Sequence, residues 1–205
     1  MRIVTLTQES KQNLLEDLLK RSPNNYGAYE DKVAAIVDDV RKRKNEAVFE
    51  YTEKFDHAEI DASNIKVTKE ELEEAYTQVD PELIEVIRKA LVNIRSYHEK
   101  QKRTSWFDSK EDGTLLGQKI TPLARVGVYV PGGKAVYPSS VLMNIVPAKV
   151  AGVGKIIMTT PCNAEGKVNP TTLVAANEAG ADEVYKVGGA QAIAALAFGT
   201  ESIEK

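Results

Sequence analysis

Hydrophobic residues in the first half of the chain recur at the period of an α-helix. Between residues 29 and 55, apolar side chains form one stripe with a 3.6-residue repeat, interrupted briefly by the basic run 41–44; its members are Val33, Ile36, Val37, Val40, Ala47, Val48 and Tyr51. The same region is highly charged and poor in glycine. We therefore expect residues up to about Lys102 to be entirely helical.

Two helix starts are marked in this half by their capping residues. Thr68, followed three residues later by Glu71, is a capping box, which predicts a helix over 69–79. Asp80 followed by Pro81 predicts a second helix start. The Asp side chain can accept a hydrogen bond from a backbone N–H that is free at the helix start, and Pro has no N–H that would need a partner there. An amphipathic pattern then predicts a long helix that ends near Lys102.

From Trp106 onward, glycine and proline become frequent and strand-like runs alternate with helical patterns. Asp112–Gly113 is a turn signal that joins two short strands. Three β-branched runs are predicted strands, and the helical patterns lie between and after them: strands 125–130, 155–160 and 183–187, helices 140–151, 171–179 and 190–198. Successive βαβ units produce a parallel sheet with helices on its faces. The predicted fold class is α/β, with an all-helical region 1–104 before a βα domain 105–205.

The composition indicates which binding partners are not expected and which cellular compartment is favoured. A formal net charge of -3 provides no field that would hold a polyanion, so nucleic acid is not an expected partner. Cys162 is the only cysteine, which excludes an intrachain disulfide and favours a reducing, cytoplasmic location. We expect neither a signal peptide nor a membrane span, because charges interrupt every apolar run.

Candidate chemistry lies in the turns that leave the predicted strands, where open parallel sheets bind ligands. The first turn is Tyr129-Val130-Pro131-Gly132-Gly133-Lys134, and the second is Gly188-Gly189-Ala190-Gln191, which leads into a helix N-terminus suited to an anionic group. A purely structural role of these glycines in turns and packing is the alternative. Neither the dinucleotide fingerprint nor the phosphate-binding loop is present, and Gly152–Gly154 is expected to end a helix.

No complete catalytic or metal constellation is found in the sequence. His57, His98 and Cys162 are far apart, so a zinc site is not expected, and both histidines are predicted to be solvated. Cys162 follows a predicted strand; we favour an inert, partly buried thiol over a nucleophile, because no base is identifiable.

The second half of the chain closely resembles histidinol dehydrogenases. The resemblance is carried by long, ordered blocks: Pro122 to Gly133, Pro138 to Met143, Val146 to Val153, Lys186 to Ala197, and Gly199 to Ser202. The helical half fits the same family more loosely. The resemblance implies an incomplete Rossmann-like parallel sheet, which agrees with the missing glycine fingerprint.

The resemblance also implies an activity, cofactors and site residues. The family is zinc-dependent and uses NAD to oxidise L-histidinol, through L-histidinal, to L-histidine, and its members are homodimers. Its NAD-contacting tyrosine and glutamine correspond to Tyr129 and Gln191. Pro131 and Gly189 are further cofactor-binding candidates because they flank those two residues.

The family's zinc ligands and acid–base residues have no counterpart in these 205 residues, because full-length members are about twice as long. We therefore expect the polypeptide to be catalytically inactive alone and, with apolar surface uncovered, to self-associate. The alternative is a non-catalytic Rossmann-like module for binding or assembly. A different small-molecule enzyme on the same sheet is a third interpretation.

Overall fold

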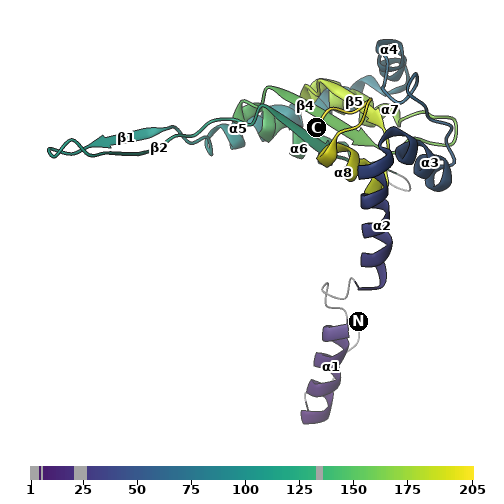
Figure 1. The fold of residues 1–205 in the computed structure, drawn as a ribbon, viewed down its shortest axis with the longest axis horizontal. Helices are drawn as coiled ribbons and strands as arrows, with labels where there is room; N and C mark the ends of the chain where they lie inside the picture. Colours follow the sequence, from purple (N-terminus) through teal and green to yellow (C-terminus); the bar gives the residue numbers. More distant parts are fainter. Residues whose placement is uncertain (1–4, 6, 21–26, 133–135) are drawn as a thin grey trace.

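The computed structural model describes residues 5, 7–20, 27–132 and 136–205, and the elements follow the predicted order (Figure 1). The helical region comprises α1 (Gln8–Lys20), α2 (Gly27–Arg43), α3 (Asn45–Asp56), α4 (Lys69–Gln78) and α5 (Pro81–Glu99). The second region comprises β1 (Trp106–Ser109), β2 (Leu115–Gln118), β3 (Arg125–Tyr129), α6 (Pro138–Ala151), β4 (Lys155–Thr160), α7 (Pro170–Ala179), β5 (Glu183–Lys186) and α8 (Gly189–Phe198). No helix among the described residues has the length and apolar character needed to cross a bilayer.

The capping residues act as predicted. Thr68 and Glu71 form both hydrogen bonds of a capping box at the start of α4. The side chain of Asp80 accepts from the N–H of Glu82, with Pro81 as the first residue of α5. Gly152 ends α6 at a positive φ of 85°, which an L side chain rarely adopts, so the prediction of a helix end at Gly152–Gly154 is confirmed.

The predicted stripe over 29–55 is divided between two helices. The break falls at Lys44, whose φ is 51°, immediately after the basic run. Arg43 pairs with carboxylates on both sides of the break, on Asp39 of α2 and on Glu46 and Glu50 of α3. The interruption in the hydrophobic pattern therefore marks a change of helix direction.

The second region contains a parallel sheet in the order β3-β4-β5. A short segment of the helical region adds to the β5 edge, where Lys66 forms an antiparallel bridge with Tyr185. The N–H of Val67 donates to the carbonyl of Val184 at 2.9 Å, and the N–H of Lys186 donates to the carbonyl of Ile65 at 2.8 Å. The chain before α4 therefore extends the sheet by one short segment. The expectation of an entirely helical region up to about Lys102 is wrong for residues 57–68, which form no helix and in part pair with β5.

Helices cover both faces of the sheet and give three layers (Figure 1). One core joins β4 residues such as Ile156 and Met158 to α5, α6 and α7. The opposite core joins Ile157 and Tyr185 to α2, α3 and α8. The α/β class with helices on the faces of a parallel sheet is confirmed. The division at 104/105 stays a prediction, and both cores contain residues from each side of it.

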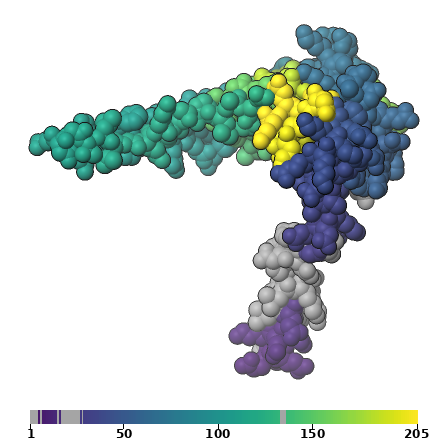
Figure 2. All heavy atoms as spheres, in the orientation of Figure 1, coloured from purple at the N-terminus to yellow at the C-terminus, as the bar shows by residue number. Residues whose placement is uncertain are grey.

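A β-hairpin projects from this layered body as an arm (Figures 1 and 2). β1 and β2 pair antiparallel around Gly113, as the Asp112–Gly113 signal predicts. Every residue from 99 to 125 is exposed, including Trp106, Phe107, Leu115 and Leu116. The chain exposes 13694 Å² in total, whereas a compact monomer of this mass exposes about 9,500 Å². The excess is surface that a compact fold would bury.

Candidate functional site

The two glycine-containing turns meet at the carboxyl edge of the sheet. Pro161, directly after β4, lies between them. A Cβ added to Gly132 would lie 2.7 Å from Cγ of Pro161, and one added to Gly188 would lie 2.7 Å from its Cβ. At Gly132 and Gly188 the backbone itself lies against Pro161, so the structure brings the described parts of the two predicted ligand-binding segments together. Gly133 and Lys134 of the first segment lie outside the described residues.

Tyr129 lies on the face of the sheet that α8 covers. It pairs in register with Thr159, which pairs with Tyr185, so the three side chains share one face. Tyr129 and Tyr185 both belong to the core beneath α8. Gln191, in the first turn of α8, is 1% exposed, and its side-chain Oε1 has no hydrogen-bond partner.

Gly189 makes room for the Gln191 side chain. Its φ is +65°, and an added Cβ would lie 2.6 Å from Oε1 of Gln191. Any other residue here would therefore be strained and would displace the carboxamide. The carboxamide folds back over the start of α8, where the backbone N–H groups of the first turn are free of intrahelical partners.

A cleft of about 490 Å³ opens on the opposite face of the sheet, towards α4 and α7. Pro131 and Gly132 line it, together with Pro161 and the first turn of α7. Tyr129, Gly189 and Gln191 are not among its lining residues. Among the four candidate residues, Pro131 therefore faces the cleft, while the other three lie on the α8 side of the same edge.

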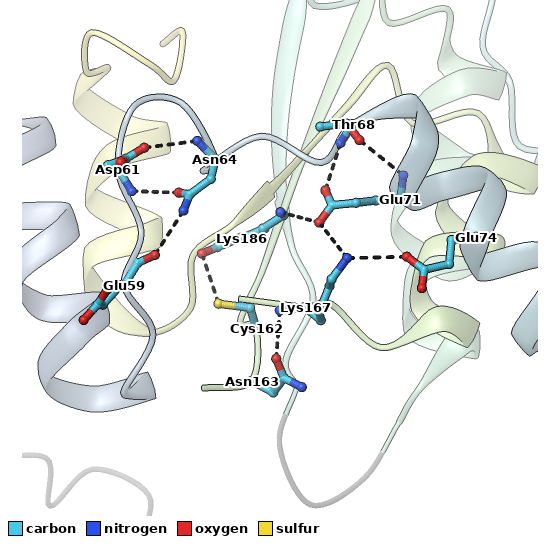
Figure 3. Close-up of polar contacts among 10 residues, drawn as sticks. All are labelled: Glu59, Asp61, Asn64, Thr68, Glu71, Glu74, Cys162, Asn163, Lys167 and Lys186. Carbon is cyan, nitrogen blue, oxygen red and sulfur yellow. Dashed lines mark hydrogen bonds and ion pairs between the residues drawn. The ribbon is translucent and has the colours of Figure 1, made fainter. Parts of the chain in front are cut away.

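A buried ion pair forms one wall of this cleft (Figure 3). Nζ of Lys186 donates to Oε1 of Glu71 at 2.6 Å, and their side chains are 6% and 16% exposed. Lys167 lies 3.7 Å from Glu71 and 3.4 Å from Glu74. Burial acts to raise the pKa of Glu71, but the Lys186 hydrogen bond and the capping N–H of Thr68 outweigh it, and the pKa falls below 4.5.

Cys162 also lines the cleft, where its thiol is partly buried and donates to the carbonyl of Lys186 at 3.8 Å. Burial, with a further contribution from the Asp56 carboxylate, raises the pKa of the thiol to about 11. A thiol with this pKa is protonated near neutral pH, which fits the inert role predicted for it.

The described residues contain no group of three or more His, Cys, Asp or Glu side chains placed to hold a metal ion. His57 is exposed and ends α3 in the left-handed conformation. His98 differs from the prediction of a solvated histidine: it is partly buried, and its Nδ1 lies 2.7 Å from Oε1 of Gln101.

Sequence reasoning missed the charged wall of the cleft. Glu71 had a sufficient local explanation as a capping residue, and Lys186 lay in a predicted strand without a visible partner. The two residues are 115 positions apart, so only the tertiary structure places them in contact. The one signal in the sequence was Lys186 at the end of a predicted strand, because a lysine that is buried there requires an oppositely charged partner.

The fold and the carboxyl edge of the sheet define the class of protein: an α/β protein with a Rossmann-like parallel sheet. At this edge two loops lie against Pro161 through their glycines, and the Gln191 carboxamide is buried. The model of the histidinol dehydrogenase family matches residues 19–205. Histidinol dehydrogenase from Heliobacterium mobile is 58% identical over 168 residues, which is 82% of this chain. That from Bacillus subtilis (strain 168) is 58% identical over 172 residues, or 84% of the chain. The chain belongs to the histidinol dehydrogenase family.

A solved structure agrees with this assignment. The crystal structure of histidinol dehydrogenase from Elizabethkingia anophelis matches with a TM-score of 0.80 and 37% sequence identity over 86% of this chain. The matched region covers 40% of that structure's chain, 39% of the Heliobacterium protein and 40% of the Bacillus protein. The present chain therefore spans about 40% of the length of these relatives.

Proposed function

We propose that this chain carries the dinucleotide-binding part of a histidinol dehydrogenase and binds NAD at the α8 side of the sheet's carboxyl edge. The observation that carries the proposal is Gln191, an almost fully buried side chain whose amide oxygen has no partner at the start of α8. A buried acceptor without a hydrogen-bond partner destabilises the folded chain. A ligand that donates a hydrogen bond to the Gln191 oxygen would explain why this residue is buried here.

The remaining candidates fit the same ligand. Tyr129 offers a ring and a phenol on the face that Gln191 occupies, and Gly189 provides the space that the Gln191 carboxamide needs. Pro131, on the cleft side of the edge, fixes the turn that leaves β3. When bound, NAD supplies the hydride acceptor, while these residues bind and orient it.

The full reaction requires groups that the described residues do not assemble. We propose that the complete protein oxidises L-histidinol through L-histidinal to L-histidine with zinc as a homodimer, as the family resemblance implies. The described residues provide no three-donor group for zinc, so we assign no zinc ligand and no catalytic residue to this chain. The cytoplasmic location stays a prediction.

Isothermal titration of the 205-residue chain with NAD tests the binding proposal. We expect measurable binding that Gln191→Ala and Tyr129→Ala each weaken at least tenfold. Lys119→Ala is the matched control, because Lys119 is exposed and directly follows β2; this variant is expected to leave NAD binding unchanged. Absence of NAD binding to the unmodified chain, or binding that neither variant alters, would contradict the proposal.

A second experiment tests the expectation that the polypeptide alone has no dehydrogenase activity. The purified chain is incubated with L-histidinol, NAD and zinc while NADH is followed by its absorbance. We expect no turnover above the protein-free rate. NADH production that a chelator abolishes would show that the chain contains a complete active site.

A further inference from the structure

The cleft lined by α4 and α7 has the size of a small-molecule site and is separate from the α8 side, where we place NAD. Its volume of about 490 Å³ lies within the range of about 300–1,000 Å³ that is typical of ligand pockets. Residues of α4, the ends of β4 and β5 and the first turn of α7 line it. Tyr129, Gly189 and Gln191 are not among them.

Lys186 is a buried cation whose hydrogen-bond donors are only partly used. Its ammonium has three N–H donors. The side chain is 6% exposed, and among the described residues Nζ has a single acceptor, Oε1 of Glu71 at 2.6 Å. The other Glu71 oxygen accepts from the N–H of Thr68, which holds the carboxylate in place. Because buried donors are normally paired, an acceptor that enters the cleft would complete the hydrogen bonding of Lys186.

A buried hydroxyl lies beside this ammonium. Thr160, at the end of β4, pairs in register with Lys186, so the two side chains are neighbours on one face of the sheet. Thr160 is 2% exposed and lines the cleft. Thr172, in the first turn of α7, is also buried and lines the same cleft. The cleft therefore presents a buried ammonium and two hydroxyls, groups that donate hydrogen bonds to an anionic oxygen.

Lys167 provides a second cation, whose present ion pairs are weak (Figure 3). Its Nζ lies 3.4 Å from Oε2 of Glu74 and 3.7 Å from Oε1 of Glu71, and both distances exceed the usual N–H···O range of about 2.7–3.2 Å. The side chains of Lys167 and Glu74 are each 54% exposed, so solvent screens their attraction. Lys167 is therefore available to a stronger acceptor within the cleft.

The arrangement of donors favours a carboxylate over a phosphate. Oδ1 of Asn169 accepts from the N–H groups of Thr171 and Thr172, so backbone donors that a phosphate would use at the start of α7 are already paired. A phosphate would also bring more negative charge towards the two glutamates of α4. The single charge of a carboxylate is balanced by Lys167.

Buried apolar side chains line another part of the cleft. Ala75, Val168 and Leu173 belong to one core cluster between α4 and α7, and all three are lining residues. They provide an apolar surface in the same cavity as the charged and hydroxyl groups. A ligand that fits both parts carries one carboxylate and a short hydrocarbon tail.

We propose that the cleft binds a small carboxylate with a short apolar tail, a molecule of the size of a branched-chain acid. Its carboxylate accepts hydrogen bonds from Nζ of Lys186, Nζ of Lys167 and Oγ1 of Thr160, and its tail packs against Val168 and Leu173. This site goes beyond the proposed function, because none of these residues is assigned to the NAD site and the test does not require NAD.

Backbone NMR of the 205-residue chain, titrated with isovalerate at pH 7, tests the proposal. We expect amide shifts at Thr160, Lys167 and Leu173 that saturate with a Kd of about 1–10 mM, because the ligand has few atoms. Isovaleramide has nearly the same shape without the charge and is expected to bind about tenfold more weakly. Equal binding of the two compounds, tighter binding of inorganic phosphate, or no saturable shift at these residues would each overturn the proposal.

Variants of Lys167 and Thr160 test which groups hold the carboxylate. Lys167→Gln and Thr160→Val are each expected to weaken isovalerate binding about three- to tenfold, because each removes a donor. Lys66→Gln is the matched control, since Lys66 is 51% exposed and pairs with Glu183 outside the cleft. The control is expected to stay within about twofold of the unmodified chain. Unchanged affinity in both cleft variants, or an equal loss in the control, would contradict the site.

Glu74→Gln distinguishes a bound anion from a bound cation. Glu74 competes with the ligand for Lys167, so its neutralisation is expected to tighten isovalerate binding about two- to threefold. Weaker binding in this variant would show that the glutamate attracts the ligand, which would overturn the proposal.

Lys186 is tested together with its partner. Lys186→Met alone leaves Glu71 buried without compensation and is expected to destabilise the chain. Combining it with Glu71→Gln removes both charges, and urea unfolding checks that the double variant is folded. We expect the double variant to bind isovalerate about tenfold more weakly. A folded double variant with unchanged affinity would overturn the proposal; if it does not fold, the Lys167 and Thr160 variants decide.

Discussion

Lys186, at the end of β5, is joined to Glu71, in the first turn of α4, by a 2.6 Å ion pair that is almost entirely buried (Figure 3). The contact attaches the helical region to the sheet at the point where residues 65–67 already pair with β5. Removing one partner leaves the other charge buried without compensation, which costs more than the pair itself contributes.

Glu71→Gln is therefore expected to lower the free energy of unfolding by about 1–3 kcal/mol at pH 7. Because the pKa of Glu71 is below 4.5 in the folded chain, its contribution is present above about pH 4.5 and is lost as the pH falls through the folded-state value. The difference between variant and unmodified chain should shrink towards pH 3, as measured by urea unfolding at several pH values. Glu74→Gln, on an exposed carboxylate, is the control; an equal effect there would contradict the account.

Gly189→Ala is expected to destabilise the chain by about 1–3 kcal/mol and to weaken NAD binding, because an L side chain is strained at a φ of +65° and displaces the Gln191 carboxamide. Thermal unfolding and NAD titration check the two effects. Gly27→Ala, where an added Cβ meets no atom within 4 Å, should change stability by no more than about 0.5 kcal/mol. If Gly189→Ala matched that control in both measurements, the steric role of Gly189 would be wrong.

Cys162 is expected to react with iodoacetamide roughly a hundredfold more slowly in the folded chain than in denaturant at pH 8. With its pKa raised to about 11, only about one thiol in a thousand is ionised at that pH, and the sulfur is also partly buried. The reaction is followed by intact mass. Equal rates in the folded and denatured chain would show that the thiol is accessible and ionised.

The hairpin arm is expected to cause self-association. Its exposed apolar side chains are part of a surface that exceeds the compact value by about 4,200 Å². Sedimentation velocity should show species larger than the monomer, and Trp106→Ser with Leu116→Ser should shift the distribution towards monomer. Val92→Ser, an equally exposed apolar residue on α5, is the control. A monomer at high concentration in the unmodified chain would contradict this prediction.

The single tryptophan, Trp106, lies on the arm and provides an internal probe of the same process. Its side chain is exposed, so its fluorescence should respond to burial of the arm. We expect the emission to move to shorter wavelength as concentration rises and to return on dilution. Emission that is independent of concentration while larger species form would place the contact elsewhere.

The elements that the sequence predicts well are those specified by local chemistry. The capping pairs at Thr68 and Asp80, the Gly152 helix end and the Asp112–Gly113 turn each depend on residues within a few positions, and all four are found. The parallel order of the strands follows from βαβ connections in the same way. The local sequence pattern could not indicate which segments, far apart along the chain, contact one another in the fold.

The candidate site shows the same limit. Strand ends and glycine pairs identify the two turns, but they do not show on which face each side chain lies, and Pro131 proves to face a different side from Tyr129.

The central claim is that NAD binds on the α8 side of the carboxyl edge, and backbone NMR during an NAD titration tests it most directly. The amides of residues 188–191 and of Tyr129 and Val130 are predicted to shift with saturation, while those of Lys167 and Thr172, in the cleft beyond Pro161, stay unchanged. Saturable shifts confined to the cleft residues, or no saturable shifts at all, would contradict it.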